Sequence, residues 1–138
     1  FEHVGRKFYN KFFNQVANLL NDDGVALIHT IGSVNKPRDP QPWITKYIFP
    51  GGMLPSSTAL GDQIRSADLE FIRSKEFGQS YSKTLRIWSQ RFNSKWNRIS
   101  ELGFDDRFRR MWNFYLTSCA SFFFSGAGDV TQVTLKKN

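Results

Sequence analysis

The sequence of 138 residues contains a single cysteine, Cys119, so an internal disulfide is excluded and a reducing compartment is favoured. Its two histidines, His3 and His29, are far apart along the chain, and no cysteine–histidine cluster has the spacing of metal ligands. No apolar run reaches the roughly 18 residues of a membrane span, and no signal peptide is visible. Chemistry that depends on a disulfide or on a metal ion is therefore not expected.

Aromatic side chains and positive charge are what the sequence has in excess. Aromatic residues make up 16% of the chain, with 14 Phe and 4 Trp, and they must pack against one another or against an apolar ligand. Lysine and arginine number 19 against 12 aspartate and glutamate, which gives a formal charge of +7. Basic chains favour phosphate-rich partners such as nucleic acid or anionic lipid headgroups, although an ordinary basic surface accounts for the charge equally well.

The most informative stretch begins at Val25. Residues 25–28 are apolar and follow a turn at 22–24, which predicts a buried strand. The strand ends in the polar residues His29 and Thr30. A strand that is apolar along its length and polar at its carboxyl end is typical of an open parallel sheet, in which ligands sit just outside the strand ends. His29 is therefore a candidate for chemistry, and the alternative is a hydrogen-bonded histidine at the end of a strand.

Hydrophobic periodicity predicts helices at 1–20, about 57–66, 81–102 and 105–124, and strands at 25–30, 69–77 and 129–136. This α/β order suits one domain, and at this length a compact fold buries roughly two-thirds of its unfolded surface. A sheet of three strands has an unpaired edge, where earlier strands of a longer protein or a second copy of this chain would dock. Phe1 opens directly into a helical pattern, and we therefore expect the sequence to be incomplete at its N-terminal side.

All 5 prolines of the chain lie at 33–57, which predicts a long loop with little regular structure. The segment also contains Trp43, Tyr47 and Phe49, so it is too apolar for a disordered linker. Residues 43–48 are long enough for about one and a half turns of helix. A loop of this length is usually functional, for example as a lid or as the wall of a binding site.

Five runs of residues resemble one enzyme family, in the same order and at similar spacing. They are Phe1–Gly5, His29–Gly32, Pro42–Gly52, Tyr81–Leu85 and Arg107–Trp112. The family is that of the cyclopropane-fatty-acyl-phospholipid synthases and mycolic acid cyclopropane synthases, which are methyltransferases dependent on S-adenosylmethionine (SAM). The resemblance is to the C-terminal portion of these enzymes, and the run Lys-Tyr-Ile-Phe-Pro-Gly-Gly at 46–52 is its most specific part.

The resemblance implies an α/β fold, the C-terminal part of a class I methyltransferase (Rossmann-like) sheet with three strands, flanking helices and an antiparallel last strand. Residues 1–138 would form one portion of that domain, with a substrate-side loop or lid at 33–57 and a helical segment at 81–124. In the family the glycine-rich SAM loop belongs to the N-terminal half, and no Gly-x-Gly-x-Gly follows a strand here. We therefore expect SAM to be bound mainly by residues outside this sequence, and the fragment alone to be inactive or weak.

The reaction that the resemblance implies is the addition of a methylene group across a cis double bond of a phospholipid acyl chain. The alkene takes the methyl group of SAM, and a bound bicarbonate then removes a proton so that the ring closes. Such chemistry needs a dry, apolar site with a base beside the cation. By position, Glu2, His29 and Tyr81 match the family's catalytic residues, and with the main chain of Ile31 they match its bicarbonate site. The acyl channel is expected to be lined by Trp43, Tyr47 and Phe49.

Simpler roles stay open for these residues. Glu2 could be a dipole or capping carboxylate near a helix start, and Tyr81 an ordinary aromatic residue at the start of a helix. Cys119 is not the counterpart of the cysteine at the family's site, which belongs to the N-terminal half. Residues 73–80 depart from the acidic and histidine-rich stretch of many members, so simple methylation and other unsaturated lipids stay open beside ring formation.

The expected partners are phospholipid acyl chains at a membrane surface, for an enzyme that is cytoplasmic and peripheral to the membrane, and no nucleic acid is expected. The basic clusters at 83–91 and 107–110 are either solvated helix faces or contacts with lipid headgroups. Two other functions stay open, namely a SAM-dependent methyltransferase with another substrate and a basic lipid-binding module without catalysis. A homodimer through the exposed sheet edge is a further alternative. Convergence of Glu2, His29 and Tyr81 in the structure would favour the enzyme.

Overall fold

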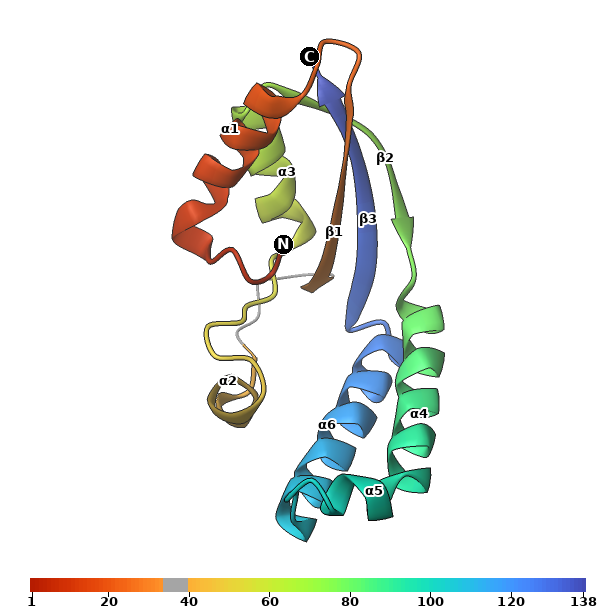
Figure 1. Ribbon diagram of the computed structural model, residues 1–138. Helices are drawn as coiled ribbons and strands as arrows, with labels where there is room; N and C mark the ends of the chain where they lie inside the picture. Colours follow the sequence, from red (N-terminus) through yellow and green to blue (C-terminus); the bar gives the residue numbers. More distant parts are fainter. Residues whose placement is uncertain (34–39) are drawn as a thin grey trace. The chain divides into compact units, whose positions relative to one another are not determined.

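The computed structural model describes residues 1–33 and 40–138. Residues 34–39, which belong to the loop predicted at 33–57, lie outside the described part. The chain divides into two compact units, and Figure 1 colours them along the sequence. The first unit comprises Phe1–Phe77 and Gly128–Asn138, and the second comprises Gly78–Ala127.

The first unit contains a three-stranded sheet in the order β1-β3-β2. Its strands are β1 (Val25–Ser33), β2 (Leu69–Glu76) and β3 (Gly128–Lys137). The last strand lies between the other two and is antiparallel to both, with a β-bulge in β2 between Phe71 and Arg73. The three predicted strands and the antiparallel last strand are therefore confirmed. Within the described residues β1 and β2 each pair with β3 in the sheet, and one parallel bridge joins Ser33, at the end of β1, to Ser56.

Helices α1 (Tyr9–Leu19) and α3 (Ser57–Ser66) lie on the same side of this sheet (Figure 1). The helix predicted at 1–20 is wrong for its first five residues. Gly5 has a φ of 78°, a left-handed conformation that interrupts a helix, and the short helix η1 (Arg6–Phe8) begins only after it. The predicted turn at 22–24 is present, and a Cβ atom on Gly24 would lie 2.9 Å from the carbonyl oxygen of Asn21, so this turn favours glycine.

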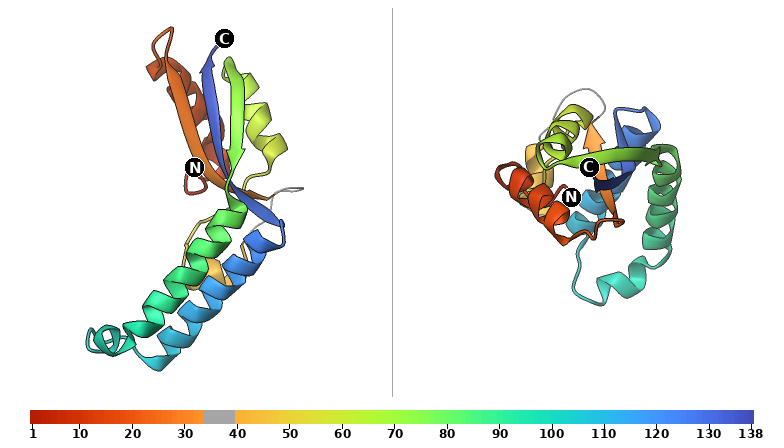
Figure 2. Two further views of the ribbon diagram at one scale, coloured as in Figure 1. Left: turned by 90° about the vertical axis from the view of Figure 1, so that its right-hand side faces the viewer. Right: turned by 90° about the horizontal axis from the view of Figure 1, so that it is seen from above.

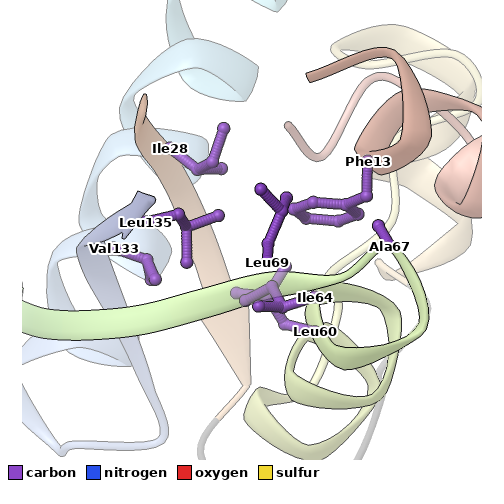
Figure 3. Close-up of a cluster of buried hydrophobic side chains, with 8 residues drawn as sticks. All are labelled: Phe13, Ile28, Leu60, Ile64, Ala67, Leu69, Val133 and Leu135. Carbon is purple, nitrogen blue, oxygen red and sulfur yellow. The ribbon is translucent and has the colours of Figure 1, made fainter. Parts of the chain in front are cut away.

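The core of the first unit lies between these helices and the sheet (Figure 3). Phe13 of α1 and Leu135 of β3 are fully buried, and full burial of each such side chain contributes about 1.5–3 kcal/mol. The cluster comprises Phe13, Ile28, Leu60, Ile64, Ala67, Leu69, Val133 and Leu135. The strand predicted to be buried is covered on only one face within the described residues. Val25 and Leu27 are 59% and 58% exposed, because α1 and α3 cover only the face that carries Ile28.

The second unit is a helical hairpin of α4 (Gly78–Ser94), α5 (Trp96–Ser100) and α6 (Asp106–Phe124). Helices α4 and α6 run side by side in opposite directions, and α5 lies at their closed end (Figure 2). The Ser82 hydroxyl of α4 donates to the carbonyl oxygen of Ala120 on α6 at 2.8 Å, and both residues are buried. This bond and the buried side chains of Leu85 and Leu116 hold the two helices together.

The sequence predicted one helix at 81–102, but the chain forms two. The break is at Lys95, whose N–H donates to the carbonyl oxygen of Phe92, three residues before it. Such a bond tightens the last turn and ends α4. The helix predicted at 105–124 is confirmed, because the Asp105 carboxylate accepts a hydrogen bond from the Phe108 N–H at 2.8 Å and so caps α6. No helix in the described residues is long and apolar enough to cross a membrane.

Candidate functional site

The side chain of Glu2 lies against the carboxyl end of β1. Its Oε2 atom accepts hydrogen bonds from the Thr30 hydroxyl at 3.1 Å, the Ile31 N–H at 3.3 Å and the amine of Phe1 at 3.3 Å. The Met53 N–H donates to the main-chain oxygen of Glu2 at 3.4 Å. The fold thus joins the start of the chain to the end of β1 and to the segment before α3, three places that are far apart in the sequence.

These contacts set the charge of the carboxylate. Burial acts to raise the pKa of Glu2, and hydrogen bonds from the backbone N–H groups of Glu2 and Ile31 act to lower it. In a chain that begins at Phe1, the positive amine of that residue lowers the pKa further. The net result is a pKa below the ordinary value for glutamate. Glu2 is therefore an ionised carboxylate at neutral pH, with a side chain that is 19% exposed. Such a group can accept a further hydrogen bond from the O–H of a ligand.

The ring of His29 is on the opposite face of β1 from the Thr30 side chain, because successive residues of a strand point to opposite faces. His29 pairs in register with Gln132 of β3, and the two side chains approach within 3.5 Å between Nε2 of Gln132 and Nδ1 of His29. The main-chain oxygen of His29 accepts from the Phe1 amine at 3.3 Å. The main chain of His29 therefore lies beside the Glu2 segment, while its exposed ring lies beside Gln132.

The aromatic loop returns to the same end of β1. Helix α2 (Pro42–Tyr47) occupies the position of the predicted helical turns. After it, the ring of Phe49 lies 5.5 Å from the ring of His3, the residue that follows Glu2. Phe49 and Tyr47 are 39% and 47% exposed, whereas Trp43 is half-buried. Of the three residues expected to line an acyl channel, Phe49 is thus placed next to the Glu2 segment.

A hollow of about 340 Å³ lies between α3 and the sheet, and Thr30 forms part of its wall. Its volume is at the lower end of the range for small-molecule pockets, which is about 300–1,000 Å³. Most of the polar residues that line the hollow carry hydroxyl groups, and the carboxylate residues Glu76 and Asp129 also line it. The apolar lining consists of Pro55, Leu60, Ile64, Phe71 and Val133.

Tyr81 lies in the second unit, on the first turn of α4. Its ring contacts Phe123 at 5.2 Å and Trp88 at 6.3 Å between centroids. On the facing helix, burial raises the pKa of Tyr115 and of the Cys119 thiol, and the two side chains are hydrogen-bonded to each other. Because Tyr81 belongs to one unit and Glu2 and His29 to the other, their convergence on a single anion stays a prediction.

Two residues of this region were missed by the sequence reasoning. Thr30 is 2% exposed, and its hydroxyl donates a hydrogen bond to the Glu2 carboxylate. The side chain of Gln132 contacts the ring of His29. Thr30 did carry a signal, since a hydroxyl residue stands between His29 and Ile31 in a predicted strand. Gln132 carried none, because its position opposite His29 depends on the register of β3. In the described residues no group of three or more His, Cys, Asp or Glu could hold a metal ion.

Comparison with known proteins gives a consistent picture. The family model described as mycolic acid cyclopropane synthetase matches residues 1–133. A cyclopropane-fatty-acyl-phospholipid synthase from Escherichia coli strain K12 is 40% identical, over 99% of this chain and 35% of that protein. The tuberculostearic acid methyltransferase UfaA1 from Mycobacterium tuberculosis is 36% identical, over 97% of this chain and 33% of that protein.

Solved structures agree with the sequence matches. The crystal structure of the mycolic acid cyclopropane synthase CmaA1 complexed with SAH and CTAB superimposes with a TM-score of 0.87 at 30% identity. The match covers 99% of this chain and 52% of that one. The chain therefore spans between about a third and a half of the proteins that it matches.

Proposed function

Because the chain belongs to the mycolic acid cyclopropane synthetase family, we propose that it is the C-terminal portion of a SAM-dependent transferase that acts on unsaturated acyl chains of phospholipids. The E. coli relative is named as a cyclopropane-fatty-acyl-phospholipid synthase and the M. tuberculosis relative as a tuberculostearic acid methyltransferase, and these names support lipid acyl chains as the substrate class. The SAH in the CmaA1 complex supports SAM as the methyl donor. The observation that carries the proposal is the match of residues 1–133 to the family model.

SAM, when bound, supplies an electrophilic methyl group for the π electrons of the alkene. The sequence contains no glycine-rich loop after a strand that could cradle such a cofactor, so SAM would be bound mainly by residues outside this sequence. The role proposed for this chain is the second half of the reaction. In that half a proton leaves the added methyl group, its electron pair closes the ring, and a base takes the proton.

Glu2 is suited to hold that base. A bicarbonate ion has one O–H group, and the ionised, partly buried Glu2 carboxylate can accept a hydrogen bond from it. The Thr30 hydroxyl and the Ile31 N–H hold Oε2 of Glu2 in place, so the carboxylate is oriented before any ligand arrives. The Ile31 N–H is engaged with Glu2, so a bicarbonate bound there would share this donor with the carboxylate. The imidazole of His29 and the hydroxyl of Tyr81 are the further groups proposed to contact the ion.

A second product is favoured by one observation. The relative UfaA1 is named as a methyltransferase, and it is 36% identical to this chain. In that variant of the reaction the base takes a proton from a neighbouring carbon of the acyl chain, so a double bond re-forms beside the methyl branch and no ring closes. Both products begin with the same methyl transfer to an alkene, so they differ only in which proton the base removes.

The test uses the protein in its full natural sequence, incubated with SAM and with phospholipid vesicles that carry cis-unsaturated acyl chains. We expect the acyl chains to gain the mass of one methylene unit. Proton NMR of the product then separates a cyclopropane ring from a methyl branch. Acyl chains that keep their mass, with SAM unconsumed, would refute the proposed reaction.

A further inference from the structure

The α4–α6 hairpin carries an exposed surface that the proposed chemistry does not use. We call it the basic face and define it by Lys83, Arg86, Arg107, Arg110, Phe114 and Phe124, all of which are exposed. On α6 the exposed positions follow a spacing of three and four residues, which places them along one stripe of the helix. The stripe consists of Arg107, Arg110, Phe114, Thr117, Ser121 and Phe124.

Both helices contribute to this one surface. The guanidinium group of Arg86, on α4, lies 5.3 Å from the centroid of the Phe124 ring, on α6. The side-chain nitrogen of Gln79 also donates to the main-chain oxygen of Phe124 at 3.1 Å. These contacts place the exposed stripe of α4 and that of α6 on the same side of the hairpin. Figure 2 shows the two helices lying side by side along their length.

Positive charge is concentrated on these helices. The second unit, 78–127, contains eight of the chain's lysine and arginine residues and three carboxylates, which gives +5 of the total of +7. Helix α4 contains no aspartate or glutamate, and α6 contains only Asp106, its first residue. The cations of the basic face therefore have no carboxylate on the middle or the last turns of either helix to balance them. A surface of this kind attracts a surface with fixed negative charge.

Phenylalanine rings stand among these cations. Phe114 and Phe124 are 60% and 61% exposed, although a ring of this size would normally be buried. They are ten residues apart on one helix, which separates them by about 15 Å along its axis. Exposed rings interleaved with lysine and arginine are the pattern of helices that lie at a membrane surface, where the rings enter the headgroup region and the cations contact lipid phosphates.

We propose that the basic face is the surface through which this protein binds an anionic phospholipid membrane, with the α4–α6 hairpin lying along the bilayer. This inference rests on the proposed function in one respect, namely that a phospholipid substrate brings the enzyme to a bilayer. The charge and the exposed rings support it independently of any catalysis. An acidic protein or a nucleic acid would satisfy the cations but would give no apolar medium for the two phenylalanine rings.

The test measures sedimentation of the full-length protein with vesicles of phosphatidylcholine alone and of phosphatidylcholine with phosphatidylglycerol. We expect binding only to the second kind, weakened by added salt. Arg107→Gln with Arg110→Gln should weaken it about tenfold or more, because each cation near such a surface is worth about 1 kcal/mol. Phe114→Ser with Phe124→Ser should also weaken vesicle binding, and by more than a substitution of exposed residues outside the basic face.

Matched controls come from the other unit, where Lys7, Lys11 and Leu19 are also exposed. Lys7→Gln with Lys11→Gln, and Leu19→Ser, should leave vesicle binding within about twofold of the parent. Arg107→Lys with Arg110→Lys keeps the charge and should keep the binding, which separates loss of charge from loss of folding. Equal binding of the parent and the Arg107→Gln, Arg110→Gln variant, or tight binding of nucleic acid with none of vesicles, would overturn the inference.

Failure of this inference is distinguishable from failure of the proposed function. Vesicle binding is measured without SAM and without turnover, so a protein that modifies no acyl chain can still bind through the basic face. Conversely, an active enzyme that binds vesicles equally well with and without the four substitutions on the basic face would refute only the proposal that the basic face binds the membrane.

Discussion

Oε2 of Glu2 accepts a hydrogen bond from the Thr30 hydroxyl at 3.1 Å, although the two residues are 28 positions apart in the sequence. The bond ties the second residue of the chain to the end of β1, in a part of the molecule where the Thr30 side chain is 2% exposed. The Ile31 N–H donates to the same oxygen. Glu2 is therefore fixed by the strand before any ligand is present.

Removing the hydroxyl at position 30 tests this link. Thr30→Val keeps the shape of the side chain but leaves the Glu2 carboxylate without one of its donors. We expect the free energy of unfolding to fall by about 1 kcal/mol, the net worth of a typical hydrogen bond. Thr30→Ser retains a hydroxyl and should lose less. Urea denaturation of the three proteins measures this, and equal midpoints for the parent and the valine variant would contradict the link.

The lowered pKa of Glu2 predicts how stability depends on pH. Since, in the chain that begins at Phe1, the folded state holds Glu2 with a pKa below its ordinary value of 4.5, the folded state binds fewer protons than the unfolded state near that pH. The ionised group therefore stabilises the fold above about pH 4.5, and this contribution disappears as the pH falls through the folded pKa. The difference in unfolding free energy between the parent and Glu2→Gln should shrink over that range. A difference that stays constant down to strongly acid pH would argue against an ionised, stabilising Glu2.

The Cys119 thiol should react slowly with alkylating agents. Burial raises the pKa of this thiol, while its hydrogen bond with Tyr115 lowers it in part. Little thiolate is then present near neutral pH, and thiolate is the reactive form. Tyr115→Phe removes the hydrogen bond that lowers the pKa of the thiol, so this pKa should rise further. The alkylation rate of the variant should then increase at a higher pH than that of the parent. The pH–rate profile of iodoacetamide labelling measures both proteins, and a profile centred below the ordinary thiol pKa would show that burial does not control this group.

The core predicts a large difference between two phenylalanines of the same helical region. Phe13 is fully buried between α1 and the sheet, whereas Phe8 is 48% exposed. Phe13→Ala should lower the free energy of unfolding by about 3–5 kcal/mol because it removes a buried ring and leaves a cavity. Phe8→Ala should change it by less than about 1 kcal/mol. Denaturant midpoints for the pair decide this, and similar losses for both would place the core elsewhere.

Much of the fold could be predicted because its signals are local. The Ser56 hydroxyl accepts from the Ala59 N–H at 3.2 Å and the Asp105 carboxylate caps α6, and both residue types stood at the expected starts of helices. The break at Lys95 was not predicted, since the apolar spacing continues across it. The exposure of Val25 and Leu27 was not predicted either, because an apolar run does not show whether one face of a strand or both are covered.

The candidate site divides in the same way. The resemblance to known enzymes supplied Glu2 and His29 as candidates, but their surroundings depend on long-range contacts. The Glu2–Thr30 bond needs the start of the chain to fold back onto β1, and the neighbour of His29 is set by the register that places Gln132 opposite it. The pattern of residues within a short stretch of sequence shows neither the Glu2–Thr30 contact nor the register of β3. The role of Tyr81 stays a prediction for the same reason.

The most direct test of the account compares the parent and Glu2→Gln for SAH formation in the full-length protein, with SAM and cis-unsaturated phospholipid vesicles. Glutamine keeps the size of the side chain but removes the negative charge proposed to hold the bicarbonate. Because a positioned base contributes about 10²–10⁴ to a rate, we predict that turnover falls about a hundredfold or more while vesicle binding is unchanged. Equal turnover by the two proteins would contradict the role assigned to Glu2, and no turnover by either would contradict the proposed reaction.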